Sequence, residues 1–270
     1  MFQPLNPPIP DWAGQRVWVV GASSGIGAAL AQALQRAGAR VAVSARRRDA
    51  LQQVVGHPPA PPIDAPNPVH EARILPLDIN DVQSVEQAFQ QLIDDWGGID
   101  VVFWVAGIYQ PMRAQNFDLP QALRMIETNL TAVFKGLSVI LPVLLRQKSG
   151  HLCLVSSVAG FRGLPHALVY GPTKAALIHL AETLYLDLHP DGIGVSVVNP
   201  GYVDTPATSI NDYPMPALIP AAQAARRTLE GVARGRFEIH YPRRFTTWLK
   251  LARHLPDRWY FALVRRVTGL

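Results

Sequence analysis

Residues 16–27 read RVWVVGASSGIG, and the rest of the predicted architecture is built around them. A valine-rich run of five residues predicts a buried strand, and a glycine-rich turn then leads into a helical pattern. Glycines let the backbone turn sharply and approach a pyrophosphate, which the N–H groups and positive dipole end of the next helix attract. A plain structural turn is the alternative. The residues expected at a dinucleotide here are Gly21, Ser23, Ser24, Gly25, Ile26 and Gly27.

The same alternation continues along the chain. Strand-like runs fall at 16–20, 40–45, 73–77, 100–105, 151–156 and 194–199, and helix-like stretches fall near 25–37, 81–96, 118–147 and 168–189. Continuous Val/Ile/Leu strands separated by helices indicate a parallel sheet that is covered on both faces. We therefore predict an α/β fold, a doubly wound parallel sheet (Rossmann-like). Residues 1–241 form one domain, with a short strand at 237–241 closing the sheet edge, and residues 242–270 form a helical tail.

Composition narrows the class of protein. Of the 270 residues, 49% are hydrophobic, which suffices for a large buried core. The one cysteine, Cys153, excludes an internal disulfide, gives no metal cluster and suits a reducing cytoplasm. We see no signal peptide and no 18-residue apolar run, so no transmembrane helix is expected.

Positive charge is concentrated at the C-terminal end. Residues 213–270 hold eleven Arg/Lys and three Asp/Glu, whereas the whole chain has a net charge of only +5. The body of the protein is therefore slightly acidic and its tail is basic.

A proline-rich segment interrupts the pattern at 57–68, where six of twelve residues are proline. Such a composition predicts an extended, exposed insertion that is partly polyproline in form. A docking ligand for a proline-binding domain is the alternative.

The end of the second strand, Ser44-Ala45-Arg46-Arg47-Arg48, bears on the choice of dinucleotide. An acidic residue at this place commonly holds a free ribose 2′-hydroxyl, whereas an arginine accommodates a 2′-phosphate. Guanidinium forks match phosphate oxygens. We expect NADP(H) in preference to NAD(H), with Arg46 at the phosphate and Ser44 as a lesser candidate. Arg47 and Arg48 can equally be solvated residues at a helix start.

Two further strand ends carry residues that suit a cofactor. Asp78, followed by Ile79, could accept a hydrogen bond from an adenine amino group, or could cap the helix that begins near residue 81. Ala106-Gly107 ends the fourth strand, where small residues allow a cofactor to pack on the backbone.

Tyr170 and Lys174 lie four residues apart and share one face if the segment is helical. A free tyrosine has a pKa of about 10, and a nearby cation lowers that pKa and favours the phenolate. This spacing can therefore deliver or accept a proton. It also fits two surface residues of an amphipathic helix, so the rest of the chain has to decide.

In these motifs the chain resembles the short-chain dehydrogenases/reductases. The matching pieces keep the family's order and spacing over about residues 14–205, and they are Gly21…Gly25-Ile26-Gly27, Asp78, Ala106-Gly107, Asn129, Ser157, Tyr170…Lys174 and Asn199-Pro200-Gly201. The chain departs from the family at Trp104 and Val105, where two asparagines are common. It also has Ser24 in the turn, where NADP-preferring members often have a basic residue.

The resemblance implies a role for each matched residue. Tyr170 is the general acid for ketone reduction and the base in reverse. Lys174 lowers the pKa of Tyr170 and bonds the nicotinamide ribose. Ser157 holds the substrate oxygen, and Asn129 keeps a water in a proton relay. Pro200 and Gly201 face the nicotinamide, and Val203 and Thr205 bind its carboxamide. A small carbonyl or alcohol is the implied substrate, and a homodimer or homotetramer paired through helices near 118–147 and 168–189 is the implied assembly.

Residues 206–236 correspond to the family's variable substrate lid, and their apolar side chains suggest a lipophilic substrate. In residues 242–270, basic and aromatic residues alternate at helical spacing. Two interpretations compete: a surface that lies on an anionic membrane, and a tail that packs on its own body or on a partner subunit. No motif supports nucleic-acid binding. The rivals to an enzyme are a non-catalytic dinucleotide sensor and a peripheral membrane protein on the same fold.

Overall fold

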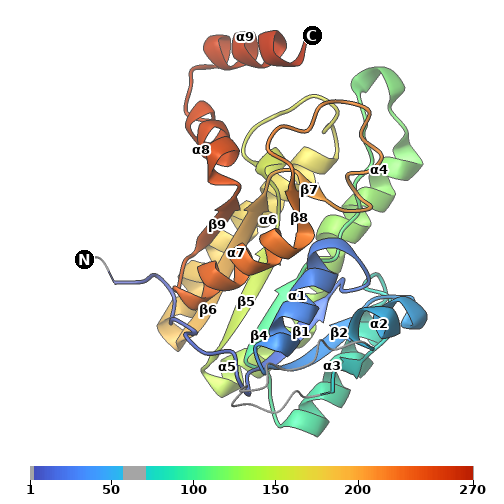
Figure 1. Cartoon of the computed structure of the whole chain (residues 1–270), viewed down its shortest axis with the longest axis vertical. Coiled ribbons are helices and arrows are strands. Elements are labelled where there is room, and N and C mark those ends of the chain that lie inside the picture. Colours follow the sequence, from blue (N-terminus) through green and yellow to red (C-terminus); the bar gives the residue numbers. More distant parts are fainter. Residues whose placement is uncertain (1–2, 57–70, 270) are drawn as a thin grey trace.

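The computed structural model describes residues 3–56 and 71–269, and a seven-stranded parallel sheet forms its centre (Figure 1). The strands lie in the order β3-β2-β1-β4-β5-β6-β9. Their bounds are β1 Arg16–Val20, β2 Arg40–Ser44, β3 Arg73–Ile74, β4 Val101–Trp104, β5 Gly150–Val155, β6 Ile193–Pro200 and β9 Glu238–Tyr241. The predicted edge strand at 237–241 is therefore confirmed as β9, parallel to β6.

Helices cover both faces of this sheet. One apolar core lies under α1 Gly25–Arg36, α2 Arg48–Val55 and α7 Ala221–Ala233. The other lies under α3 Val82–Trp96, α5 Ala132–Gln147 and α6 Tyr170–Leu188. The remaining elements are the helices α4 Leu119–Ile126, α8 Arg243–Ala252 and α9 Asp257–Thr268 and the small strand pair β7 Val203–Asp204 and β8 Ile219–Pro220.

The valine-rich strands explain why two layers of helices are needed. Val17 and Val19 of β1 enter the core beneath α1, whereas Trp18 and Val20 enter the opposite core. Side chains alternate across a strand, so a strand that is apolar on both faces has to be covered on both. The predicted doubly wound sheet is confirmed.

The strand order reverses between β1 and β4. From β1 the chain continues to β2 and β3 on one side of the sheet, and from β4 it continues to β5 and β6 on the other. Ligands of open α/β sheets bind beyond the carboxyl ends of the strands at such a switch point. The turns after β1, β2, β4, β5 and β6 all end at this edge, and they carry the residues singled out in the sequence.

Two predicted elements differ in detail. The helix expected at 118–147 is divided by a π-helical segment, Glu127–Thr131, which widens the helix where buried Asn129 turns inward. The strand expected at 73–77 has only two residues in regular pairing. Even so, Leu75 N and Leu77 N still donate to Val43 O and Ala45 O, so the segment keeps its place beside β2.

The continuous helical run Leu119–Gln147 is long and apolar enough to cross a membrane, by length and composition only. Its buried side chains, among them Val133, Leu137 and Ile140, pack into the core beside α3 and α6. This is the packing of a core helix, which passes the same test of length and composition.

The proline-rich insertion expected at 57–68 lies outside the described residues. The tail, predicted to be helical, contains α8 and α9, and Figure 1 shows them at one end of the molecule beyond β9. The division into a domain at 1–241 and a tail at 242–270 stays a prediction.

Candidate active site

Close packing requires glycine in the turn after β1. A Cβ on Gly27 would lie 2.1 Å from the carbonyl oxygen of Gly21, and a Cβ on Gly21 would lie 2.5 Å from the backbone nitrogen of Ala106. Gly21 and Gly25 also have φ of +93° and +55°, a region that side chains disfavour. The turn is therefore a cradle of bare backbone that ends at the N-terminus of α1.

A large cavity of about 1300 Å³ opens at this edge of the sheet. Nearly all residues expected at the site line it. They are Gly21, Ser23, Ser24, Gly25, Ile26, Gly27, Arg46, Asp78, Ile79, Ala106, Gly107, Ser157, Tyr170, Lys174, Pro200, Gly201, Val203 and Thr205. Segments far apart in the sequence thus meet around one space.

Two predicted residues do not line the cavity. Ser44 is fully buried in β2, and its hydroxyl accepts a hydrogen bond from Trp18 Nε1 at 2.8 Å, so the suggestion that it contacts a cofactor is wrong. Asn129 is fully buried as well. Its amide donates to Ile108 O at 2.9 Å and to Thr173 Oγ1 at 3.3 Å.

The end of β2 separates the three arginines. Arg46 lines the cavity, whereas Arg47 is the N-cap of α2 and Arg48 is the first residue of that helix. Arg46 is thus the only guanidinium of the three that is placed to meet a ligand in this cavity.

The alternatives for Asp78 are also separated. Asp81 is the residue that caps α3, because its carboxylate accepts from Gln83 N at 3.0 Å. Asp78 instead accepts from Asn80 N at 3.0 Å while lining the cavity. Capping the helix is therefore not the role of Asp78.

Tyr170 and Lys174 occupy the first turn and a half of α6 and face the same cavity. Lys174 Nζ lies 5.6 Å from the centre of the Tyr170 ring and donates to Val155 O at 3.0 Å. This carbonyl at the end of β5 holds the ammonium beneath the phenol.

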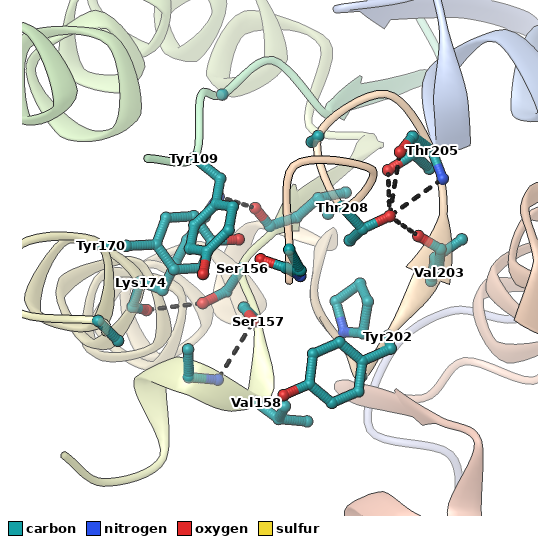
Figure 2. A pocket seen from close by; sticks show the side chains of 18 of the residues that line it. Tyr109, Ser156, Ser157, Val158, Tyr170, Lys174, Tyr202, Val203, Thr205 and Thr208 are labelled. Atoms are coloured by element: carbon teal, nitrogen blue, oxygen red, sulfur yellow. Dashed lines mark hydrogen bonds between the residues drawn. The ribbon is translucent and has the colours of Figure 1, made fainter. Parts of the chain in front are cut away.

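The two neighbouring serines have different partners. Ser156 is buried, and its hydroxyl donates to Lys174 O at 2.6 Å, which ties the end of β5 to α6. Ser157 accepts from Ala159 N at 3.1 Å and lies beside the Tyr170 hydroxyl (Figure 2). Only Ser157 is placed to share a substrate oxygen with the phenol.

Burial dominates the protonation of this pair. It raises the pKa of Tyr170 to about 12, although the hydrogen bond from Ser157 acts to lower it. It also lowers the pKa of Lys174 to about 8, because the ammonium is removed from water without a carboxylate partner. The lowering of the tyrosine pKa that was expected from Lys174 is therefore not seen in the protein alone, where burial has the largest effect. Tyr170 is held as a neutral phenol, which is the form that donates a proton.

Sequence reasoning missed a group of aromatic residues around Tyr170. The Tyr109 ring lies edge-on to the Tyr170 ring at 4.9 Å, as Figure 2 shows, and the Tyr109 and Tyr213 hydroxyls are 3.0 Å apart. Tyr213 stacks on His166 at 5.8 Å. Tyr109 comes two residues after Ala106-Gly107 in the turn that follows β4, and this place was a usable signal. Tyr213 comes from the lid and has no such signal.

The sequence also gave no sign that the tail reaches the cavity. Side chains of α8 and α9 form part of its lining, and among them are Trp248, Leu251, Leu263 and Val267. Tail and lid together enclose the space in front of Tyr170.

A backbone cradle beside a phenol, an ammonium and a serine hydroxyl defines a dinucleotide-dependent oxidoreductase as the class of protein. Comparison with known proteins agrees. The family model described as short chain dehydrogenase matches residues 15–213. An uncharacterized oxidoreductase of Myxococcus xanthus is 33% identical over 249 residues, which are 92% of this chain and 96% of that protein.

Another uncharacterized oxidoreductase, of Mycobacterium tuberculosis, is 34% identical over 72% of this chain and 76% of its own length. The crystal structure of a short-chain type dehydrogenase/reductase from Mycobacterium marinum matches with a TM-score of 0.74 and 27% identity, covering 85% of this chain and 94% of that one. The chain belongs to the short-chain dehydrogenase/reductase family. It is an oxidoreductase of small molecules, in a family that uses nicotinamide dinucleotides.

Proposed function

We propose that this protein is an NADP(H)-dependent oxidoreductase that reduces a carbonyl to an alcohol, or catalyses the reverse. The observation that carries the proposal is the convergence of Tyr170, Ser157 and Lys174 on the cavity that also contains the glycine cradle. A non-catalytic sensor would have no need of all these proton-handling side chains.

The cavity fits a dinucleotide on steric grounds. At Gly21 and Gly27 even a methyl group would collide with backbone, so these positions keep the turn open at the N-terminus of α1. Backbone N–H groups there suit a pyrophosphate. Arg46 would hold a 2′-phosphate, and Asp78 and Ile79 would lie at the adenine. Ala106, Gly107, Pro200, Gly201, Val203 and Thr205 would line the nicotinamide end.

In reduction the bound dinucleotide supplies the hydride, and the protein supplies a proton and the orientation of the substrate. The Tyr170 hydroxyl and the Ser157 hydroxyl would both donate to the substrate oxygen, where negative charge develops. Tyr170 then transfers its proton to that oxygen. A positioned acid of this kind typically contributes a factor of about 10² to 10⁴ in rate.

Lys174 would support this transfer by its charge and by donating to the nicotinamide ribose. Its ammonium is buried close to the Tyr170 ring, so it stabilises the phenolate that the transfer leaves behind. Asn129 would hold the water that returns a proton towards Lys174, because it lies within the same buried cluster. A Cβ on Gly107 would lie 3.2 Å from Asn129 Oδ1 and 3.4 Å from Lys174 Nζ, which shows how near the two groups are.

A lipophilic substrate fits the part of the cavity in front of Tyr170. Lid residues Pro214, Met215 and Pro216 line this part, together with the apolar residues of the tail. Lys174 and Arg124 are the charged side chains of the lining outside the dinucleotide end.

The test is a screen of ketones of increasing chain length with NADPH, and of the matching alcohols with NADP⁺, followed by NADH and NAD⁺. We expect oxidation of NADPH with lipophilic ketones and a slower reaction with NADH. Binding of NADPH without turnover of any carbonyl or alcohol would favour the sensor instead.

We further propose a homodimer or homotetramer in a reducing cytoplasm. The outward faces of α5 and α6 carry exposed apolar side chains, with Phe134 51% and Leu186 71% exposed. Cys153 is a free thiol that is fully buried in β5, which suits a reducing compartment. Light scattering of the purified protein checks the assembly, and a monomer would contradict it.

A further inference from the structure

The tail is fixed to the body at two buried points. Thr246 of α8 is fully buried and bonds His240 Nδ1 at 2.7 Å. Tyr260 of α9 donates to Gly163 O at 2.8 Å, and the Arg162 guanidinium stacks over its ring at 3.9 Å. The tail therefore packs on its own body through one side, as one of the two interpretations predicts. The occupant of its other side is then a membrane surface or a second copy of the chain.

The other side of the tail is apolar and open. Trp248, Leu251 and Val267 are 72%, 57% and 75% exposed, and the same three side chains line the cavity. A side chain that is exposed to solvent and also lines the cavity lies at the mouth of that cavity. The cavity therefore opens to the outside between α8 and α9, through a rim of apolar groups.

Two of the three arginines of α9 lie opposite its apolar side. Trp259, Leu263 and Val267 recur every four residues and share one side of the helix, while Arg258 and Arg265 recur seven residues apart on the other. Arg266, seven residues after Trp259, lies at the edge of the apolar side. A helix with an apolar side and a basic side lies in the plane of a membrane surface, with its arginines reaching lipid phosphates. Trp259 is 69% exposed, and indole rings favour that boundary.

Charge decides between a membrane and a second copy of the chain. Residues 242–270 hold seven Arg/Lys and one Asp, a net of +6, so the rest of the chain has a net charge of only −1. Two such tails repel each other in a symmetric contact, and the nearly neutral body offers little attraction. An anionic lipid surface attracts each basic residue of the tail.

We propose that α8 and α9 seat the mouth of the cavity on an anionic membrane surface, so that a substrate with a long apolar chain passes from the bilayer directly to Tyr170. Figure 1 shows α8 and α9 together at one end of the molecule, where a flat surface can meet them. The substrate is thus a carbonyl or alcohol carried by a membrane lipid or a molecule dissolved in the membrane. This last step rests on the proposed function, whereas the docking does not.

Sedimentation with vesicles tests the docking. The full-length protein is mixed with phosphatidylcholine vesicles, with or without phosphatidylglycerol, at low and high salt. We expect binding to the anionic vesicles that salt weakens, and at least a tenfold loss of affinity for Trp259→Ser and for Arg258→Glu. Neither residue lines the cavity. Matched controls far from the tail, Leu5→Ser and Arg36→Glu, should bind as the wild type does.

Equal recovery in the supernatant with and without anionic vesicles would overturn the docking. A wild type that does not bind vesicles but forms a dimer through its tail would overturn it as well. In that case light scattering would show a dimer for the wild type and a monomer for the Trp259→Ser variant. Circular dichroism of each variant shows that it is folded.

Activity tests the route of the substrate. The Trp259→Ser variant should catalyse the reduction of a long-chain ketone embedded in anionic vesicles at least tenfold more slowly than the wild type. It should catalyse the reduction of a short water-soluble ketone at the wild-type rate. Equal effects on both ketones, or no effect on either, would overturn the route. A wild type that reduces no carbonyl contradicts the proposed function, while the vesicle binding still decides the docking.

Discussion

Asn129 clamps the backbone of Ile108 from both sides. Its side-chain oxygen accepts from Ile108 N at 2.7 Å, and its amide donates to Ile108 O at 2.9 Å. The π-helical segment brings Asn129 to this place, and the clamp fixes the chain just after Gly107. One wall of the cavity beside Lys174 thus depends on a buried side chain that the cavity itself does not expose.

Asn129→Ala should destabilise the protein. Loss of the amide leaves the half-buried N–H and C=O groups of Ile108 without these partners, at a cost of about 1 kcal/mol for each. Urea unfolding measures the change. Asn116→Ala is the control, since Asn116 also bonds backbone, at Arg113 N, but in an exposed loop. Equal stability of the two variants would contradict the clamp.

Gly27→Ala should distort the cradle. The new methyl group would lie 2.1 Å from Gly21 O, so backbone has to move, and overpacking of this kind costs about 1–3 kcal/mol. We expect a lower melting temperature and weaker binding of NADPH, followed by fluorescence titration. Gly163→Ala, where a Cβ meets nothing within 4 Å, should change neither. An unaffected Gly27→Ala variant would refute the steric argument.

Arg46→Asp should shift the coenzyme preference towards NADH. A hydrogen bond to a charged group contributes about 1.5–3 kcal/mol, so NADPH affinity should fall roughly tenfold to a hundredfold. Arg47→Asp makes the same change of charge outside the cavity and should have little effect. The ratio of kcat/KM for NADPH and NADH decides, and an unchanged ratio in Arg46→Asp would remove the assignment of the 2′-phosphate.

The burial of Lys174 should make stability depend on pH. Because burial lowers its pKa from 10.5 to about 8, the unfolded chain binds the extra proton between these values, and stability contributed by this group rises as the pH increases through that window. At about 1.4 kcal/mol per pKa unit the rise is roughly 3 kcal/mol.

The measurement is the difference in unfolding free energy between the protein with Lys174 and the Lys174→Met variant as a function of pH. Both proteins are made in the Tyr170→Phe background, because Lys174 lies beside the Tyr170 ring, and the contributions of the more distant tyrosines cancel in the difference. A difference that stays constant between pH 8 and pH 10.5 would show that Lys174 keeps an ordinary pKa.

The sheet and much of the site could be predicted from the sequence because their signals are local. Valine-rich runs, the glycine turn and the Tyr170/Lys174 spacing each predict a local structure from a few neighbouring residues. Parallel strands then bring their carboxyl ends to one edge, so separate motifs meet in one cavity. The presence of Arg46 at the cavity followed from its place at the end of β2.

What could not be predicted depends on contacts between distant residues. The bond from Trp18 to Ser44, 26 residues away, removes Ser44 from the cavity. The approach of Tyr213 to Tyr109 spans 104 residues. The docking of Tyr260 on Gly163 spans 97 residues and brings the tail to the mouth of the cavity. No pattern of neighbouring residues in the sequence predicts such long-range contacts.

Turnover and NADPH binding of the Tyr170→Phe variant test whether Tyr170 is the proton donor. Removal of the hydroxyl takes away the proton donor and leaves the ring in place beside Tyr109. Turnover should fall by a factor of about 10² to 10⁴ while NADPH binding is kept, and Tyr109→Phe should keep most of the activity. A Tyr170→Phe variant that turns over its substrate as the wild type does would show that Tyr170 is not the proton donor.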